Sequence, residues 1–469
     1  MIVMKFGGTS VGDAECIRNA AKLVRDAAET HGPVVVVVSA MSGVTNMLID
    51  AAFDAARGEG DAWLTAKDEL LERHRNAVLE VASDVKRGIV VLEQIEHLLD
   101  NFTNLCKSIA VLGELTPRGL DVVSSFGERM SVGIVAEALR KEGVRAEAIE
   151  STELVITDHS FGNASPRMDL TRQKCRERLL PLLDKGIVPV VTGFIGATEE
   201  GVITTLGRGG SDYSAAILAR CLDATDLWIW TDVDGVMTAD PRVVPDARTL
   251  PRISYAEASE LSYFGAKVLH PKTMRPAIEG GIPVRILNSF NPAHPGTLLT
   301  EEPDRNNQNV KGIASISDLS IVTVGGRGMM GVPGISAKVF SAAARSGTSL
   351  YMISQASSEQ TICFVVQERN TERVLNVLRQ ELELELSRQD IDNISAQRGV
   401  AIVAVVGGGM KGTPGISGKV FGAMGRNGIN VIAIAQGSSE INISFVVDAR
   451  DIQDAVRAVH AEFGLSKEA

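Results

Sequence analysis

The chain is short of aromatic residues, of cysteines and of long hydrophobic runs. Aromatic side chains make up only 4% of its 469 residues. The valine run Val34 to Val38 is far too short to cross a bilayer, because a membrane helix needs about 20 apolar residues. The N-terminal sequence MIVMKFGGTSVG lacks the basic stretch and apolar core of a secretory signal. We therefore expect a cytoplasmic protein that does not contact the membrane.

Cysteine and positive charge are the next shortages. The five cysteines are scattered and form no CxxC pair, which argues against a zinc site or a disulfide framework and favours buried free thiols in a reducing compartment. Lys and Arg total 47 against 58 Asp and Glu, a net charge of −11. This balance argues against general binding of nucleic acid or anionic lipid. We expect small-molecule partners.

Apolar residues, at 45% of the chain, are sufficient for several globular cores. From Met1 to about Leu299, short β-branched runs alternate with helical stretches, which predicts an α/β domain around a largely parallel, buried sheet. Helices are predicted at Asp13 to Thr30, at Asp212 to Cys221, and as a two- or three-helix insertion at residues 62–112. The clearest strands are Ile2 to Phe6, Pro33 to Ser39, Ile187 to Gly193, Val202 to Leu206, Asp226 to Thr231 and Pro283 to Leu287.

The C-terminal part is an internal repeat. GMMGVPGISAKVF at residues 328–340 returns as GMKGTPGISGKVF at residues 409–421, and Gln355 returns as Gln436. Each copy predicts a strand, a glycine turn, a helix, a further strand and hairpin, and a second helix. We place the first domain at 1–300, a linker at 301–312, and the repeat units at 313–390 and 391–469. Two such units are expected to pack side by side and bury each other's sheet edges.

Both repeats contain a formal GxGxxG, at Gly326, Gly328 and Gly331 and again 81 residues later. A dinucleotide site would need an acidic residue about 20 positions further on and a larger half-domain. Neither is present, so ordinary glycine turns are the better interpretation.

KFGGTS, residues 5–10, follows a predicted buried strand and opens a helix. Backbone N–H groups freed by Gly7 and Gly8 could surround a phosphate while Lys5 neutralises it. An ordinary tight turn is the alternative.

LGRGGSDYSA, residues 206–215, repeats this logic at another strand end. Arg208 could hold a carboxylate bidentately. Asp212 could either cap its own helix or hold the ammonium group of an amino acid.

Four further segments each have a plain interpretation, and two of them also have a functional one from their residues alone. The loop from Thr231 to Arg242 could bind Mg²⁺ through water or simply turn the chain. Lys267 could meet a phosphate or be a solvated surface lysine. Glu128 in FGERMS, like the segment SAMSGVTN at residues 39–46, could be mere helix capping.

Taken together, KFGGTSVGD, SAMSGVTN, FGERMS, GFIG, TTLGRGGSDYSAA, WTDVDGV, TADPR and FGAKVLHP occur in this order and resemble the aspartate kinases of the amino-acid kinase family. The repeat is similar to the paired ACT domains that regulate those enzymes. The resemblance implies a three-layer α/β catalytic domain followed by two ACT-like sandwiches. It implies that ATP is held by Lys5, Gly7, Gly8, Thr9, Ser10, Thr231, Asp232, Arg242 and Lys267, and L-aspartate by Thr45, Glu128, Phe194, Arg208, Ser211 and Asp212.

The activity implied is transfer of the γ-phosphoryl group of ATP to the side chain of L-aspartate, with Mg²⁺ and with Lys5, Arg208 and Asp212 as catalytic residues. Aspartate, with a pKa of about 3.9, is already an anion at neutral pH and needs no general base. A catalytically dead amino-acid sensor and a kinase for another acidic amino acid are the alternatives. The intact set of Lys5, Arg208 and Asp212 argues against the sensor.

Regulation is implied by the ACT resemblance. MISQASSE and IAQGSSE resemble threonine-sensitive enzymes, some fused to homoserine dehydrogenase, so threonine is preferred over lysine as inhibitor. Gln355 and Gln436 would offer amides to this effector, or are buried structural glutamines. ACT pairing implies a homodimer or homotetramer. Because Ala469 is the last residue given, we expect no dehydrogenase domain.

Overall fold

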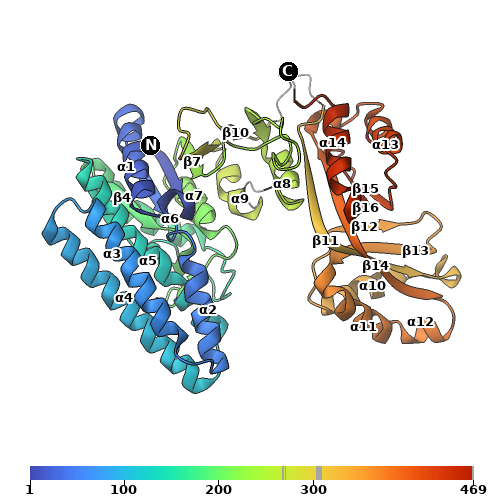
Figure 1. Ribbon diagram of the computed structural model, residues 1–469, viewed down its shortest axis with the longest axis horizontal. Coiled ribbons are helices and arrows are strands. Elements are labelled where there is room, and N and C mark those ends of the chain that lie inside the picture. Colours follow the sequence, from blue (N-terminus) through green and yellow to red (C-terminus); the bar gives the residue numbers. More distant parts are fainter. Residues whose placement is uncertain (267–268, 270, 303–308, 467–469) are drawn as a thin grey trace. The chain divides into compact units, whose positions relative to one another are not determined.

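The computed structural model describes residues 1–266, 269, 271–302 and 309–466 (Figure 1). By compactness the chain forms two units, Met1–Val236 with Leu269–Glu301, and Met237–Val268 with Glu302–Ala469. Residues 237–266 thus group with the repeats. The boundaries expected from the sequence, at 300, 312 and 390, stay a prediction.

The first unit is built on a mostly parallel sheet. Its strands follow the order β3-β4-β2-β1-β7-β9-β10, with β10 antiparallel to β9. All residues of β1 and β2 are buried, as expected of strands covered on both faces. The strands predicted for β1, β2, β4, β7 and β9 agree with the observed ones to within one residue at either end, whereas β3 and β10 were not predicted. The strands are β1 (Ile2–Phe6), β2 (Val34–Val38), β3 (Ala146–Ile149), β4 (Val188–Thr192), β7 (Asp226–Thr231), β9 (Val284–Asn288) and β10 (Thr297–Thr300).

One predicted strand pairs elsewhere. The run Val202 to Leu206 forms β6 (Ile203–Thr205), which pairs with β5 (Ile195–Ala197) in a separate two-stranded hairpin. This hairpin carries the chain from the end of β4 to the start of α7.

Amphipathic helices cover the sheet. The helix α1 is capped by Asp13, whose side chain accepts from the backbone N–H of Cys16, and it buries Ile17, Ala21 and Val24 along one face. The predicted helical insertion consists of two helices, α3 and α4, which run side by side (Figure 1). The helices of this unit are α1 (Ala14–His31), α2 (Val44–Arg57), α3 (Ala62–Val81), α4 (Val85–Leu112), α5 (Pro117–Lys141), α6 (Met168–Asp184), α7 (Gly210–Cys221) and α9 (Pro271–Glu279).

The repeats share one antiparallel sheet with the order β12-β13-β11-β14-β16-β15. The strand predicted at the start of each repeat is part of a longer strand, because the two central strands, β11 and β14, each pair with strands of both repeats. Residues 312–316 pair with 402–406, and residues 319–325 with 393–400. One repeat thus covers a sheet edge of the other, as expected. The strands are β11 (Gly312–Gly325), β12 (Met352–Gln355), β13 (Thr361–Gln367), β14 (Asn393–Val406), β15 (Ala433–Gln436) and β16 (Asn442–Asp448).

Figure 1 shows these strands between two groups of helices, α13 with α14 and α10 with α11 and α12. Each group packs on its own repeat. Phe364 and Phe445, at equivalent positions of β13 and β16, are fully buried in the two separate cores. The helices are α10 (Ile335–Arg345), α11 (Thr371–Glu381), α12 (Glu383–Ser387), α13 (Ile416–Arg426) and α14 (Ile452–Glu462).

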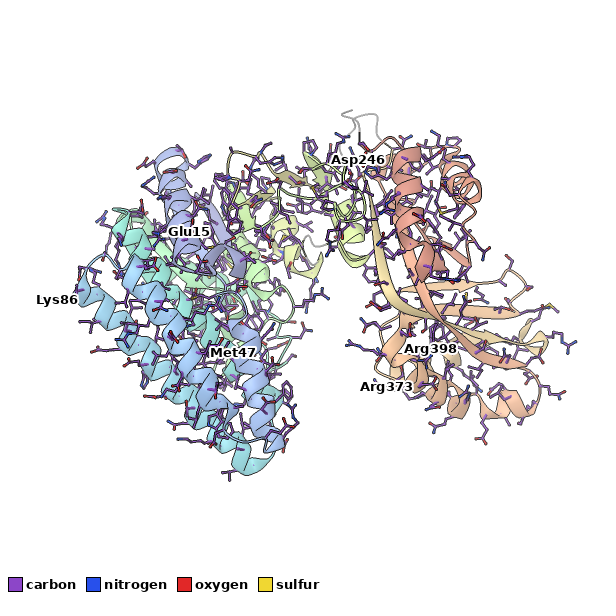
Figure 2. All side chains as sticks on the ribbon, in the orientation of Figure 1. Glu15, Met47, Lys86, Asp246, Arg373 and Arg398 are labelled. Atoms are coloured by element: carbon purple, nitrogen blue, oxygen red, sulfur yellow. The ribbon has the colours of Figure 1, made fainter. Side chains whose placement is uncertain are left out.

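Residues 237–266 pack on the second repeat. Ala239 and Val244 belong to its apolar core, and Asp246, labelled in Figure 2, accepts a hydrogen bond from Ser466. The segment continues through β8 (Arg252–Ser254) into α8 (Tyr255–Tyr263). There the buried carboxylate of Glu257 accepts from the backbone N–H of Gly408 at 2.6 Å. The fold of this segment therefore depends on the second repeat.

Within the described part of the chain, no helix combines the length and apolarity needed to cross a membrane. The five cysteines are free thiols, three of them buried.

Candidate active site

A cavity of about 780 Å³ lies at the carboxyl ends of β1, β2 and β7. Ligands of α/β sheets bind at this edge, where neighbouring connections leave the sheet. The cavity collects most of the residues singled out from the sequence. They are Lys5, Gly7, Gly8, Thr9, Thr45, Glu128, Phe194, Arg208, Ser211, Asp212 and Thr231.

Lys5 and Asp212 form an ion pair across this cavity, with 2.6 Å between Nζ and Oδ1. Both side chains are largely buried, at 11% and 16% exposed. Asp212 lies in the first turn of α7, whose N-cap is Gly209 without any side-chain cap. Asp212 therefore does not cap its own helix. Its carboxylate holds the Lys5 ammonium at the place where an anion would be neutralised.

The KFGG turn differs in one respect from expectation. The backbone N–H of Gly7 is not freed, because it donates to the carbonyl of Trp230 at 3.1 Å and extends the pairing of β1 with β7. Gly8 packs closely, since a Cβ there would lie 3.0 Å from the carbonyl oxygen of Ala40, and a phosphate contact of its N–H stays a prediction. Ser10 is buried, and its hydroxyl lies 2.8 Å from that of Ser289. A phosphate contact of Ser10 stays a prediction.

Glu128 reaches the cavity because α5 approaches the end of β2 closely. A Cβ on Gly127 would lie 2.7 Å from the Cβ of Ala40, so the preceding glycine permits this contact. The Glu128 side chain is buried, which raises its pKa to about 8. Its Oε2 atom has no hydrogen-bond partner among the described residues. A buried carboxylate oxygen without a partner suits a cationic ligand group.

Arg208 and Phe194 lie on neighbouring turns. Arg208 is exposed between Gly207 and Gly209, whose φ angles are 79° and 72°, and forms no ion pair with the described residues. Phe194 has a φ of 69° and is fixed by hydrogen bonds from its N–H to Ser214 and to its carbonyl from Leu206, each 2.9 Å. Such a backbone costs about 1–3 kcal/mol and is concentrated at functional sites.

The structure does not bring all the residues expected to bind the nucleotide into this cavity. Thr231 lines the cavity and donates to Asp232 at 3.1 Å. Arg242 belongs to the other compact unit, where it is exposed and paired with Asp240 at 3.0 Å. Lys267 lies outside the described residues.

Asp121 and Gly162 also line the cavity and were not singled out from the sequence. Asp121 stands seven residues before Glu128, two helical turns away on the same face of α5. The seven-residue spacing from Glu128 was the feature of the sequence that could have identified Asp121 as a residue of this cavity. No group of three or more potential metal ligands occurs among the described side chains.

A second cavity, of about 280 Å³, lies in the first repeat between its glycine turn and β12. Gln355 is exposed at the end of β12, as Gln436 is at the end of β15, so neither is a buried structural glutamine. Glu359 accepts from the N–H of Gly331 at 3.0 Å. The lining residues are Met329, Gly331, Val332, Pro333, Gly334, Ile335, Ser336, Gln355, Glu359 and Ile362.

Comparison with known proteins decides the family. A model of the amino acid kinase family matches residues 1–288, and a model of the ACT domain matches residues 322–382 and 403–463. The chain belongs to the amino acid kinase family. The expected fold, an α/β kinase domain followed by two ACT units, is confirmed.

Relatives of this family member are aspartokinases. It is 37% identical to bifunctional aspartokinase/homoserine dehydrogenase 2 of Arabidopsis thaliana, over 99% of this chain and 51% of that protein. It is 34% identical to lysine-sensitive aspartokinase 3 of Escherichia coli, over 98% of both chains. The chain spans about half the length of the bifunctional relatives.

Solved structures agree. The crystal structure of E. coli aspartokinase III with aspartate and ADP, described as the R-state, matches with a TM-score of 0.82 at 32% identity, covering 98% of this chain and 99% of that one. The T-state structure of that enzyme with lysine and aspartate matches with a TM-score of 0.79 at 33% identity, covering 99% of both chains. The resemblance to aspartate kinases expected from the sequence is confirmed.

Proposed function

We propose that the protein is an ATP-dependent aspartate kinase that forms 4-phospho-L-aspartate. The observation that carries this proposal is one cavity that combines the Lys5–Asp212 ion pair, the buried Glu128 carboxyl group, and Arg208, which has no ion-pair partner among the described residues. The E. coli relative solved with aspartate and ADP supports it.

In this reaction an oxygen of the aspartate side chain bonds to the γ-phosphorus of ATP. The bond from that phosphorus to the β–γ bridging oxygen breaks, and ADP leaves with the electron pair. The acceptor carboxylate is already ionised, so charge neutralisation and in-line placement are the main demands. Lys5 supplies positive charge beside the cavity. Mg²⁺ would enter as part of the Mg-ATP substrate, held mainly by phosphate oxygens.

The amino-acid end of the substrate would be fixed by groups of opposite charge. Arg208 would hold the α-carboxylate in a bidentate contact. Glu128 and Asp212 would hold the ammonium group. Because the pKa of Glu128 is raised to about 8 by burial, a bound ammonium would favour its ionised form and lower that pKa.

We propose feedback inhibition through the repeats, with threonine as effector. In the first-repeat cavity the carboxylate of Glu359 already accepts from Gly331, and Gln355 offers a neutral amide. Threonine needs one carboxylate acceptor for its ammonium group, and amide or hydroxyl partners for its carboxylate and its hydroxyl. Lysine would need a further acceptor for its second ammonium group. Lysine is the alternative, since the E. coli relative is named lysine-sensitive.

Assembly and location complete the proposal. We expect a homodimer or homotetramer formed through the ACT units, and a cytoplasmic enzyme, for which five free thiols are suited. The plant relatives are named chloroplastic, so a plastid is the alternative compartment.

The test is phosphorylation of L-aspartate by the purified chain with Mg-ATP, trapping the acyl phosphate with hydroxylamine. We expect aspartyl hydroxamate, and less of it when threonine is added. Loss with lysine instead would overturn only the effector. No product from aspartate, glutamate or N-acetylglutamate would favour a catalytically dead sensor.

A further inference from the structure

Asp121 is a buried carboxylate in the cavity wall that the proposed reaction does not use. It is 1% exposed. Its two oxygens accept hydrogen bonds from three donors of two other segments, the N–H of Gly162 at 3.0 Å, the N–H of Thr205 at 3.0 Å and the hydroxyl of Thr205 at 2.7 Å. Hydrogen bonds to a charged acceptor are stronger than neutral ones.

These bonds join the two parts of the cavity that carry substrate-binding groups. On one side, Asp121 and Glu128 stand seven residues apart on the same face of α5. On the other, Thr205 ends β6, three residues before Arg208. The distance between Arg208 and Glu128 therefore depends on how β6 is held against α5.

The loop 158–166 adds to this connection. Ala164 donates to the carbonyl of Thr205 at 2.9 Å, and Gly207 packs so closely that a Cβ there would lie 2.9 Å from the side chain of Asn163. Asp121 holds the N–H of Gly162 within the same turn. The Asp121 carboxylate thus holds both segments that pack beside the Arg208 turn, namely β6 and the loop 158–166.

We propose that Asp121 is a positioning residue, whose carboxylate sets the separation between Arg208 and Glu128 and thereby the fit of the substrate's α-carboxylate and ammonium groups. This inference rests on the proposed aspartate kinase activity. Since Asp121 touches the substrate-side turns, its loss changes aspartate binding more than nucleotide binding. Misplacement by about 1 Å can cost as much as 100-fold in such sites.

The experiment compares Asp121→Ala and Asp121→Asn by steady-state kinetics and thermal unfolding. For Asp121→Ala we expect the KM for aspartate to rise by about 10-fold or more, with less than about a two-fold change in the KM for ATP. Asp121→Asn keeps the shape and one acceptor, while the Thr205 hydroxyl can turn to accept from the amide. It should recover most of the aspartate affinity.

Asp158→Ala is the matched control. Asp158 accepts from Ser160 and Ser165 at 3.1 and 3.0 Å and holds the same loop from its outer end, so its removal loosens the loop without freeing β6. We expect a near-normal KM for aspartate. If Asp121→Ala proves unfolded, Thr205→Val alone and combined with Asp121→Asn gives a double-mutant cycle, in which a non-additive rise in KM supports the proposal.

Lower thermal stability of both Asp121 variants with an unchanged KM for aspartate would overturn the positioning role alone. Equal increases in KM for Asp121→Ala and Asp158→Ala would also overturn it, because any loosening of the loop would then suffice. If the wild-type protein forms no aspartyl hydroxamate, the proposed function itself fails, and the positioning role with it.

Discussion

The two cavities with a proposed role are built from different chemistry. The cavity of about 780 Å³ in the first unit contains a buried ion pair and a buried carboxylate. The cavity of about 280 Å³ in the first repeat is lined by glycine backbone, the Gln355 amide and one carboxylate already engaged by Gly331. The larger site thus combines an ion pair with a buried carboxyl group, whereas the smaller one combines backbone and amide groups with the single carboxylate of Glu359.

The proposed roles of the two cavities, catalysis and recognition, make different physical demands. Phosphoryl transfer moves negative charge and is accelerated by preorganised positive groups. An effector needs only to bind one arrangement of the protein better than another, for which a few kcal/mol suffice. Substitutions in the first cavity should therefore change the reaction itself, and substitutions in the second should change only its response to the effector.

The largest effect is expected from Lys5→Ala. Removing a preorganised charge from such a site typically costs about 100- to 1,000-fold in kcat, and here Asp212 would also lose its partner. Steady-state kinetics measure this, with Lys22→Ala on the exposed face of α1 as control. Effector binding by calorimetry should be unchanged. A kcat within about three-fold of the wild type would contradict the role assigned to the charge.

Glu128→Gln should weaken substrate binding and strengthen the fold. Because the folded pKa is raised from 4.5 to about 8, the folded state keeps a proton that the unfolded state releases between these values. The free energy of unfolding therefore falls as pH rises from about 4.5 through about 8. Glutamine removes this loss.

We expect the variant to unfold at a higher temperature than the wild type at about pH 8.5 and above, and to show a KM for aspartate raised by about 10-fold. Thermal unfolding across pH and kinetics check the two effects. An identical pH profile of Tm in variant and wild type would show that Glu128 is not a buried, protonated carboxyl.

Gln355→Ala should act on the second cavity alone. Loss of one amide contact costs about 1 kcal/mol, or roughly five-fold in the concentration of threonine that halves activity. Gln436→Ala gives the comparison for the second repeat. Unchanged inhibition in both variants would show that the glutamines do not bind the effector. A changed kcat in the absence of effector would show that the second cavity also affects catalysis.

The smallest effect is expected from exchanging Val332 and Thr413. Val332 is the only lining residue of the first-repeat cavity whose counterpart 81 residues later differs in type. Val332→Thr and Thr413→Val should each shift the inhibitory concentration by less than about three-fold, since Val332 is exposed and one hydroxyl contact at such a place contributes only about 0.5 kcal/mol. A larger shift in only one variant would identify the repeat that binds the effector.

Local patterns predicted much of the fold. The mainly apolar runs of β1 and β7 predicted the bounds of these strands without error, because both lie in the interior of the sheet, where strands carry few polar residues. The 14-residue lengths of β11 and β14 were not predicted. The N-terminal part of each strand pairs with the central strand of the other repeat, residues 312–316 with 402–406 and residues 393–400 with 319–325. That pairing has no local signal.

The sequence predicted which residues line the site, but it did not predict the contacts that these residues make with one another. Motifs brought Lys5, Glu128 and Arg208 forward, and all three line one cavity. The ion pair of Lys5 with Asp212 joins residues 207 positions apart, and the donors that hold Asp121 come from two other segments. Such contacts follow from the folded topology, which single motifs do not contain.

We propose that the protein phosphorylates aspartate in the cavity that contains the Lys5–Asp212 ion pair. The most direct measurement is phosphorus NMR of the purified chain with L-aspartate and Mg-ATP, followed in time. We expect an acyl-phosphate resonance that grows in step with ADP and that is absent with Lys5→Ala. Release of inorganic phosphate without an acyl phosphate, or no consumption of ATP, would contradict it.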